Sequence, residues 1–366
     1  MSLEFIGFIG PSEQSESLAQ RGQRVDNAFI KASIRAQEYG GFDKALIAVN
    51  SASPDSLAIG AYAAGISDSL GLLIAQRPGF TSPTLAARQL ATLDQLSGGR
   101  VSVNVITGGD GGDLQRDGDF LPHDERYERT EEYLQVAKQV WTSSGPFDHS
   151  GKHFRVQGNH TAVRPLQKPH IPIYFSGASE AAVRVAAQHA DVYMMWGEPL
   201  AQVQARIAAV RAEAAKFGRA DKIRFSLSLR PIVADTEAEA WARADRILQR
   251  AKASYPASDF VKRRGANINV GSDRLVEIAR QARVQDKRLW TEIAAVTAAA
   301  GNSTGLVGTP EQVAESVLDY YRLGVTTFLF RGFDPLQDAV AYGQHLIPLV
   351  RQQVAELERG AQRAVA

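Results

Sequence analysis

Cysteine is absent from this 366-residue chain, and methionine occurs only three times. Without cysteine the protein can form no disulfide, no thiolate nucleophile and no Cys-based metal site, a composition that fits a reducing compartment. A charge excess is absent too, since 41 Lys+Arg are matched by 40 Asp+Glu for a net charge of +1. No long basic run appears, so nucleic acid is not an expected partner.

Long apolar runs are also missing. The N-terminal segment Met1–Ile9 lacks a basic stretch followed by a long apolar one, so we expect neither a signal peptide nor a membrane span. The predicted location is therefore the cytoplasm. With 44% hydrophobic and 22% charged residues, the chain can bury a sizeable core without a metal or a disulfide.

Short apolar segments alternate with longer amphipathic ones, which is typical of β-α units feeding a parallel sheet. We expect strands at Leu3–Ile9, Lys44–Val49, Ser69–Gln76, Val101–Thr107, Ile171–Ser176, Asp191–Trp196, Ile223–Val233 and Thr326–Arg331. Eight such units favour an α/β fold, a TIM (β/α)8 barrel in a single domain over residues 1–366. The alternative, an open doubly wound sheet, lacks its GxGxxG fingerprint.

Two segments interrupt the repeat. Residues 143–169 contain GPFDHSGKHFRVQG, in which Gly-Pro and Ser-Gly pairs punctuate two short β-like pieces, so we predict an inserted hairpin. Residues 254–309 form a long insertion before the last βα unit. Long insertions at the carboxyl ends of barrel strands usually act as lids or substrate walls, so we predict a lid there.

Polar residues stand at the predicted strand ends, where TIM-barrel sites form. Asn104 and Thr107 end the fourth strand. Gly177, Ala178 and Ser179 follow the fifth strand and open a helix, whose free N–H groups could hold an anion or could simply be capped by the serine. The seven histidines show no metal-ligand spacing, and no GxSxG elbow is present, so neither a metal site nor a Ser-His-Asp triad is expected.

The last three strands carry a second set of candidates. Trp196 ends the sixth strand, and its indole N–H needs a partner if buried. Ser228 and Arg230 on the seventh strand are two apart and share a face, as do Arg331 and Phe333 after the eighth. An arginine that points into a barrel mouth indicates an anionic ligand, whereas an exposed one indicates nothing, and the spacing alone leaves both open.

The run FLPHDERYER at Phe120–Arg129 precedes a predicted helix. Its acids and Arg129 are expected to form a solvated helix start, which favours acidic residues in the first turn. His123 and Tyr127 are four apart and share a face of that turn.

Several blocks together resemble the bacterial luciferase-like flavin monooxygenases, most closely the reduced-FMN-dependent alkanesulfonate monooxygenases. The resembling blocks are RPGFTSPTLAARQLATLDQLSGGRVSVNVITG (77–108), GDFLPHDERYER (118–129), FSGASEAA (175–182), YMMWGEP (193–199) and GLVGTPEQVA (305–314). They occur in the family's order over nearly the whole chain. The resemblance implies a TIM barrel with FMN at its carboxyl-terminal face.

The resemblance also implies which positions contact FMN. These positions are Asn50, Asn104, Thr107, His123, Tyr127, Gly177, Ala178 and Ser179. Thr107 would bond the flavin ring system. His123 and Tyr127 would reach the phosphate or ribityl region, and the helix start after the fifth strand would hold the phosphate.

On the substrate side the resemblance is less complete. The implied pocket positions are Trp196, Ser228, Arg230, Arg331 and Phe333. Trp196 matches a tryptophan that looks toward the sulfonate in the alkanesulfonate enzymes. Their Arg-x-His pair is replaced here by Ser228 and Arg230, and their tyrosine after the last strand by Phe333. Either the anion site is rebuilt around the two arginines, or the substrate is not a sulfonate, and no general base is identifiable.

The implied activity is that of a two-component monooxygenase. A separate NAD(P)H-dependent reductase would supply reduced FMN, and O2 would convert a small organosulfonate, the anionic substrate, into an aldehyde and sulfite. The alternatives are oxygenation of another molecule such as a sulfone, an amine carboxylate or an alkane, a deazaflavin-dependent dehydrogenase, and a flavin-binding protein without catalysis. A homodimer or homotetramer is also implied.

Overall fold

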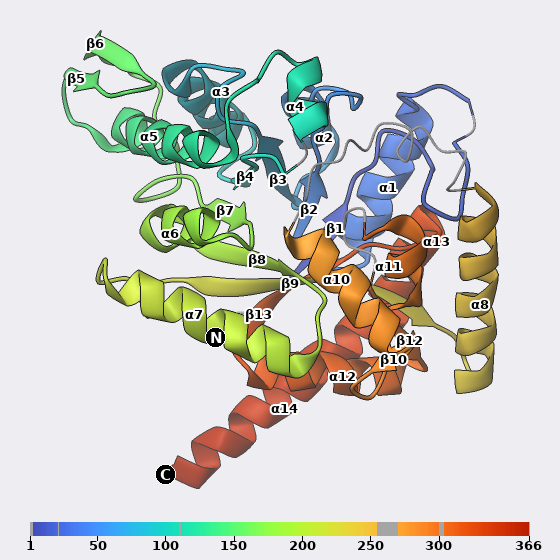
Figure 1. Ribbon diagram of the computed structural model, residues 1–366. Coiled ribbons are helices and arrows are strands. Elements are labelled where there is room, and N and C mark those ends of the chain that lie inside the picture. Colours follow the sequence, from blue (N-terminus) through green and yellow to red (C-terminus); the bar gives the residue numbers. More distant parts are fainter. Residues whose placement is uncertain (1–2, 21, 110, 255–269, 300–303, 366) are drawn as a thin grey trace.

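Eight parallel strands close into a barrel in the computed structural model, which describes residues 3–365 apart from 21, 110, 255–269 and 300–303 (Figure 1). The strands, in barrel order, are β1 (Glu4–Phe8), β2 (Lys44–Ile47), β3 (Gly71–Gln76), β4 (Val101–Val105), β7 (Ile173–Ser176), β8 (Val192–Trp196), β9 (Arg224–Val233) and β13 (Val325–Phe330). The pairing of β13 with β1 closes the ring. The predicted TIM barrel is confirmed, and the open sheet is excluded.

Helices cover the outside of the barrel (Figure 1). The helices are α1 (Asn27–Tyr39), α2 (Ser56–Ile66), α3 (Pro83–Leu96), α4 (Gly111–Arg116), α5 (His123–Thr142), α6 (Glu180–His189), α7 (Leu200–Ala215), α8 (Glu237–Ser254), α10 (Val270–Gln281), α11 (Glu292–Thr297), α12 (Pro310–Arg322), α13 (Pro335–Ala341), the π-helical turn η2 (Tyr342–Leu346) and α14 (Ile347–Val365). Side-chain caps begin several of them, including Asp26, Ser82 and Thr309.

The strands alternate between two buried faces. Ile6, Tyr174 and Leu329 belong to a small cluster inside the barrel, whereas Phe225 and Phe328 belong to the large core between barrel and helices. Because side chains alternate along a strand, the even-numbered residues of β9 face inward. The polar side chains at the carboxyl ends of the strands therefore converge on the mouth of the barrel.

The predicted hairpin is present as β5 (Phe147–Ser150) and β6 (Arg155–Asn159), which pair antiparallel. Glu132 on α5 holds it in place. The Glu132 carboxylate accepts hydrogen bonds from the backbone N–H groups of His153 (2.8 Å) and Phe154 (2.7 Å), and it lies 2.9 Å from Nε2 of His149. A Cβ at Gly151 would lie 1.9 Å from the same carboxylate, so a larger residue there would displace Glu132 from these contacts.

The described part of the 254–309 insertion packs against the barrel. It contains α10, α11 and three strands, β10 (Val284–Gln285), β11 (Leu289–Trp290) and β12 (Gly305–Gly308), of which β12 runs parallel to β9. Arg274 on α10 forms an ion pair with Glu198, which follows β8. The insertion thus builds a wall beside the barrel mouth. The predicted lid at 254–309 includes 255–269 and 300–303, which lie outside the described residues, so the lid stays a prediction, as does the single domain over residues 1–366.

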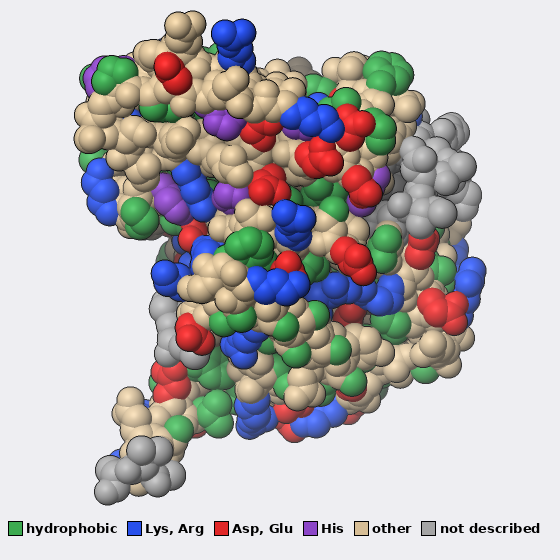
Figure 2. All heavy atoms as spheres, turned by 60° about the vertical axis from the view of Figure 1, so that its left-hand side comes forward, with side chains coloured by type: hydrophobic (Ala, Val, Ile, Leu, Met, Phe, Trp, Pro, Cys, Tyr) green, Lys and Arg blue, Asp and Glu red, His purple; other side chains and the backbone are tan. Residues whose placement is uncertain are grey.

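Charged side chains of both signs are interspersed on the face seen in Figure 2, which accords with the near-zero net charge. Among the described helices, none combines the length and the apolar character that crossing a bilayer requires.

Replacing Glu132 with Ala should release the hairpin. The substitution leaves two partly buried N–H groups without their acceptor, so we expect a loss of about 1–3 kcal/mol in the free energy of unfolding. Urea denaturation gives the stability, and amide exchange at Phe154 reports the local opening. Glu128→Ala is the matched control, because the exposed Glu128 reaches the same hairpin from α5 through side-chain ion pairs, with Lys152 at 2.7 Å and with Nε2 of His153 at 3.8 Å. Equal losses in both variants would contradict the anchoring role.

Candidate active site

A cradle for an anion forms where β7 leads into α6. Ser179 caps the helix, its Oγ accepting a hydrogen bond from the Ala182 N–H at 3.3 Å. Gly177 has φ +144°, and a Cβ there would lie 2.5 Å from the Ala182 Cβ and 3.1 Å from the Tyr127 hydroxyl oxygen. The cradle therefore needs glycine, and it presents helix N–H groups beside a tyrosine hydroxyl, a setting that suits a phosphate.

Side chains from two other helices, α5 and α7, line this cradle. The Tyr127 hydroxyl interacts with the Ser179 side chain, while burial raises the pKa of Tyr127 and keeps the phenol protonated as a donor. The His123 ring lies 5.0 Å from the Tyr127 ring, centroid to centroid, and its side chain is 46% exposed. Arg206 on α7 donates to the carbonyl of Ala178 at 3.3 Å. Sequence reasoning missed this cation, because an arginine in an amphipathic helix carries no distinguishing pattern.

Asn104 on β4 and Thr107, which follows β4, lie at the barrel mouth between β3 and β7. Asn104 is buried, and among the described residues its Oδ1 has no hydrogen-bond partner. Thr107 is also buried, and its hydroxyl lies 3.1 Å from that of Thr130 on α5. A buried acceptor without a donor is costly unless a ligand supplies one. An N–H group of a flavin ring fits that requirement, so the residues present are compatible with FMN.

Asn50 lies in an exposed turn after β2, and its side chain is already engaged. Its Oδ1 accepts from the N–H of Ala52 at 2.9 Å. The neighbouring Ser51 bonds to Asp113 on α4, which also forms an ion pair with the buried Arg77 at the end of β3. This connection between three parts of the mouth was not predicted, although Arg77 begins one of the resembling sequence blocks.

Arg230 does not point a free charge into the mouth. Its side chain is 0% exposed, and its Nη1 lies 2.5 Å from Oε2 of Glu16. Its other nitrogens donate to the carbonyls of Arg331 (3.3 Å) and Gly332 (2.9 Å), and its guanidinium lies 3.5 Å from the Phe333 ring centroid. The prediction that Arg230 binds an anionic substrate is corrected, because Glu16, in the loop after β1, already neutralises it.

The prediction that Phe333 lines the substrate pocket is also corrected. It is fully buried beneath Arg230 and packs edge-on against Trp290, with 6.1 Å between ring centroids. It supports the arginine and does not face the mouth.

Ser228 is buried two residues before Arg230 on the same face of β9, and Trp196 is its register partner on β8. Trp196 packs against the insertion through Leu275 and its neighbours.

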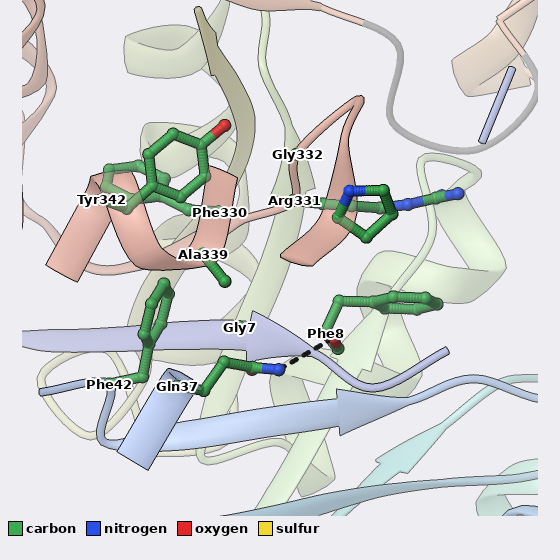
Figure 3. A pocket seen from close by; sticks show the side chains of 10 residues that line it. Gly7, Phe8, Gln37, Phe42, Phe330, Arg331, Gly332, Ala339 and Tyr342 are labelled. Atoms are coloured by element: carbon green, nitrogen blue, oxygen red, sulfur yellow. Dashed lines mark hydrogen bonds between the residues drawn. The ribbon is translucent and has the colours of Figure 1, made fainter. Parts of the chain in front are cut away.

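Arg331 remains accessible at the carboxyl end of β13. Its side chain is 25% exposed, and its guanidinium lies 4.8 Å from the Phe8 ring centroid. Figure 3 shows Arg331 and Phe8 extending in the same direction, next to a small cleft whose opposite end is lined by Phe42 and Tyr342. Within the described residues, the one carboxylate near Arg331 is Glu16, 3.7 Å away and beyond hydrogen-bonding distance. Arg331 therefore keeps donors for a ligand.

The start of α5 is less solvated than the sequence suggests. Arg129 is largely buried and makes two hydrogen bonds to the carboxylate of Asp119. Its guanidinium occupies the space in which a Cβ of Gly79 would lie. Arg126 is buried as well and donates to the carbonyl of Leu121. The prediction of a solvated arginine at position 129 was wrong, because both arginines tie the helix start to the neighbouring loops.

A closed barrel with an anion cradle and buried polar groups at one mouth is the arrangement typical of cofactor-binding α/β-barrel enzymes. Residues 3–327 match the luciferase-like monooxygenase family, and the chain belongs to that family. The family prediction is confirmed, whereas closeness to the alkanesulfonate enzymes stays a prediction.

Solved structures with the same fold are about one-fifth identical to the chain. A riboflavin lyase, solved with modified FMN and riboflavin, has a TM-score of 0.79 at 20% identity, covering 96% of this chain and 92% of its own. A long-chain alkane monooxygenase has a TM-score of 0.76 at 21% identity, covering 96% and 92%. EDTA monooxygenase from Chelativorans sp. BNC1 has a TM-score of 0.72 at 20% identity, covering 96% and 94%. At this identity the likeness shows the shared fold.

Glu16 should stabilise the fold down to strongly acidic pH. Burial opposes its ionisation, but Arg230 and Arg331 outweigh burial and lower the pKa of Glu16 to about 2, from its ordinary value of 4.5. A lowered folded-state pKa contributes stability above pH 4.5, and the contribution disappears as the pH falls toward 2. Glu16→Gln should thus cost about 3 kcal/mol at neutral pH, as expected for a broken buried pair.

The measurement is the free energy of unfolding of wild type and Glu16→Gln across this pH range. The difference between them should shrink as the pH falls below 4.5. Glu13→Gln serves as the control, since Glu13 is an exposed carboxylate of the same loop. A Glu16→Gln deficit that stays constant down to pH 2 would show that the carboxylate charge is not its source.

Proposed function

We propose that the chain is a two-component monooxygenase that uses reduced FMN from a separate NAD(P)H-dependent reductase, together with O2, to oxygenate a small anionic substrate. The observation that carries the proposal is the pairing of a phosphate-type cradle at α6 with an accessible arginine at β13. Two strands, β8 and β9, lie between β7 and β13 in the barrel order, so the two features stand apart on the rim of one mouth. The flavin ring would lie between them.

The geometry of the site supports particular roles for its residues toward a flavin. The N–H groups after Gly177, the Ser179 side chain, Tyr127 and Arg206 would hold the phosphate. His123 would contact the phosphate or the ribityl chain, and Thr107 and the Asn104 Oδ1 would meet the ring. Reduced flavin, when bound, supplies the two electrons with which O2 gives one oxygen atom to the substrate and one to water. The wall formed by α10 and α11 would help to exclude water from the mouth.

An organosulfonate is the leading substrate class. For a primary sulfonate, one oxygen atom enters the carbon that bears sulfur, the C–S bond breaks, and the products are an aldehyde, sulfite, water and oxidised flavin. Arg331 would bind the sulfonate oxygens, and Trp196 would donate its indole N–H. A carboxylate could replace the sulfonate at Arg331. A neutral alkane or sulfone would leave this arginine without a partner, which disfavours such substrates.

Ser179 should matter for FMN far more than for stability. Ser179→Ala removes a cap and a phosphate ligand, so FMN affinity should fall about tenfold, equal to about 1.4 kcal/mol. Ser82→Ala is the matched control, because Ser82 caps α3 in the same way but lies outside the cradle. Fluorescence titration with FMN measures both variants. If Ser179→Ala and Ser82→Ala bind FMN with equal affinity, the start of α6 does not bind the phosphate.

A screen for sulfite release tests the activity. The chain, reduced FMN and O2 are combined with alkane-, aryl- and sugar-sulfonates, and with carboxylates of matched length in an oxygen-consumption assay. We expect turnover of at least one anionic class, and Arg331→Gln should raise KM about tenfold or more while FMN affinity is retained. If only carboxylates give oxygen-dependent products, the substrate class is a carboxylate and not a sulfonate. Retained FMN binding without any product would favour a non-catalytic flavin protein.

A further inference from the structure

One carboxylate stands between the two arginines at the substrate side of the mouth. Glu16 directs Oε2 to Nη1 of Arg230 at 2.5 Å and Oε1 toward Nη2 of Arg331 at 3.7 Å. It comes from the loop between β1 and α1, so a segment distant in sequence supplies the charge. Two guanidinium groups and one carboxylate leave the cluster with a net charge of +1.

The two arginines share this carboxylate unequally. Arg230 is fully buried and spends its remaining donors on the carbonyls of Arg331 and Gly332, while its face rests on Phe333. Arg331 has an open edge, and Glu16 lies too far away to bond to it. The residual positive charge is therefore presented to a ligand by Arg331 alone, and Arg230 acts as its buried support.

We infer that Glu16 sets the charge selectivity of the substrate site: by holding the cluster at +1, it selects a head group with a single negative charge, such as a sulfonate or a carboxylate, over a doubly charged phosphonate or phosphate monoester. The inference rests on the proposed function, since it requires the substrate head to bind at Arg331. A second negative charge on the ligand would meet the Glu16 carboxylate instead of a second free cation.

The surroundings make this effect large enough to measure. The side chain of Glu16 is 10% exposed and that of Arg230 is 0% exposed, so salt and water screen their charges weakly. The arginines also hold the pKa of Glu16 far below neutrality, so its charge is present throughout the physiological range. The selectivity is therefore a fixed property of the site.

The test compares ligands that differ only in head-group charge. The full chain with bound FMN is titrated calorimetrically with ethanesulfonate and ethylphosphonate, and with octanesulfonate and octylphosphonate, at a pH above the second pKa of the phosphonates. Four proteins form a charge series in this cluster. Arg230→Met gives 0, wild type and the double variant Glu16→Gln/Arg230→Met both give +1, and Glu16→Gln gives +2. Replacing a buried ion pair with a neutral pair is usually tolerated, so the double variant should fold.

The ratio of sulfonate to phosphonate affinity should follow the cluster charge. Wild type and the double variant should both prefer the sulfonate about tenfold, Glu16→Gln should lose or reverse that preference, and Arg230→Met should lose phosphonate binding most strongly. A wild-type ratio in folded Glu16→Gln would overturn the inference. If Glu16→Gln fails to fold, the other two variants decide. The inference is overturned if Arg230→Met binds the sulfonate and the phosphonate with wild-type affinities, or if the double variant prefers the phosphonate.

Failure of the proposed function gives a different result. Loss of oxygenation with every sulfonate and carboxylate, while the charge-dependent binding series persists, would refute the monooxygenase and leave the selectivity intact. Oxygenation of an anionic substrate with a charge-independent series would refute only the role of Glu16.

Discussion

Barrel closure is the constraint on which the rest of the structure depends. Because β13 pairs with β1 and all eight strands are parallel, their carboxyl ends meet at one mouth, and residues that are hundreds of positions apart become neighbours. The cradle at Gly177 and the cation at Arg331 share one mouth only for this reason. Alternation along the strands then decides which polar groups enter the mouth and which join the surrounding core.

The barrel could be predicted from sequence because its signals are local and repeated. Each strand is a short apolar run, and several helix starts carry a capping side chain, so all eight strands are where the pattern places them. The hairpin was equally readable from its turn residues. The cluster at Tyr127, Gly177 and Ser179 came from the resemblance to a family, and the structure brings these residues together.

The site contacts that could not be predicted are those between residues far apart in the sequence. Nothing around Glu16 distinguishes it from other acids of a polar loop, yet it decides that Arg230 is a buried support and Arg331 the accessible cation. Arg206 likewise reaches the cradle only because α7 packs beside α6. Arg129 is predicted to be solvated from its sequence context, but its ion pair with Asp119 buries it. Two arginines with equal sequence signals therefore have different tasks, because burial and counter-ions are settled by tertiary contacts.

The central claim is that the α6 cradle holds the phosphate of a flavin. It is tested most directly by comparing the anaerobic binding of reduced FMN with that of reduced riboflavin, which differs only in lacking the phosphate. The structure predicts that FMN binds at least about tenfold more tightly, since a charged group held by helix N–H groups and a guanidinium contributes more than 1.4 kcal/mol. Equal affinities for the two flavins would contradict the account.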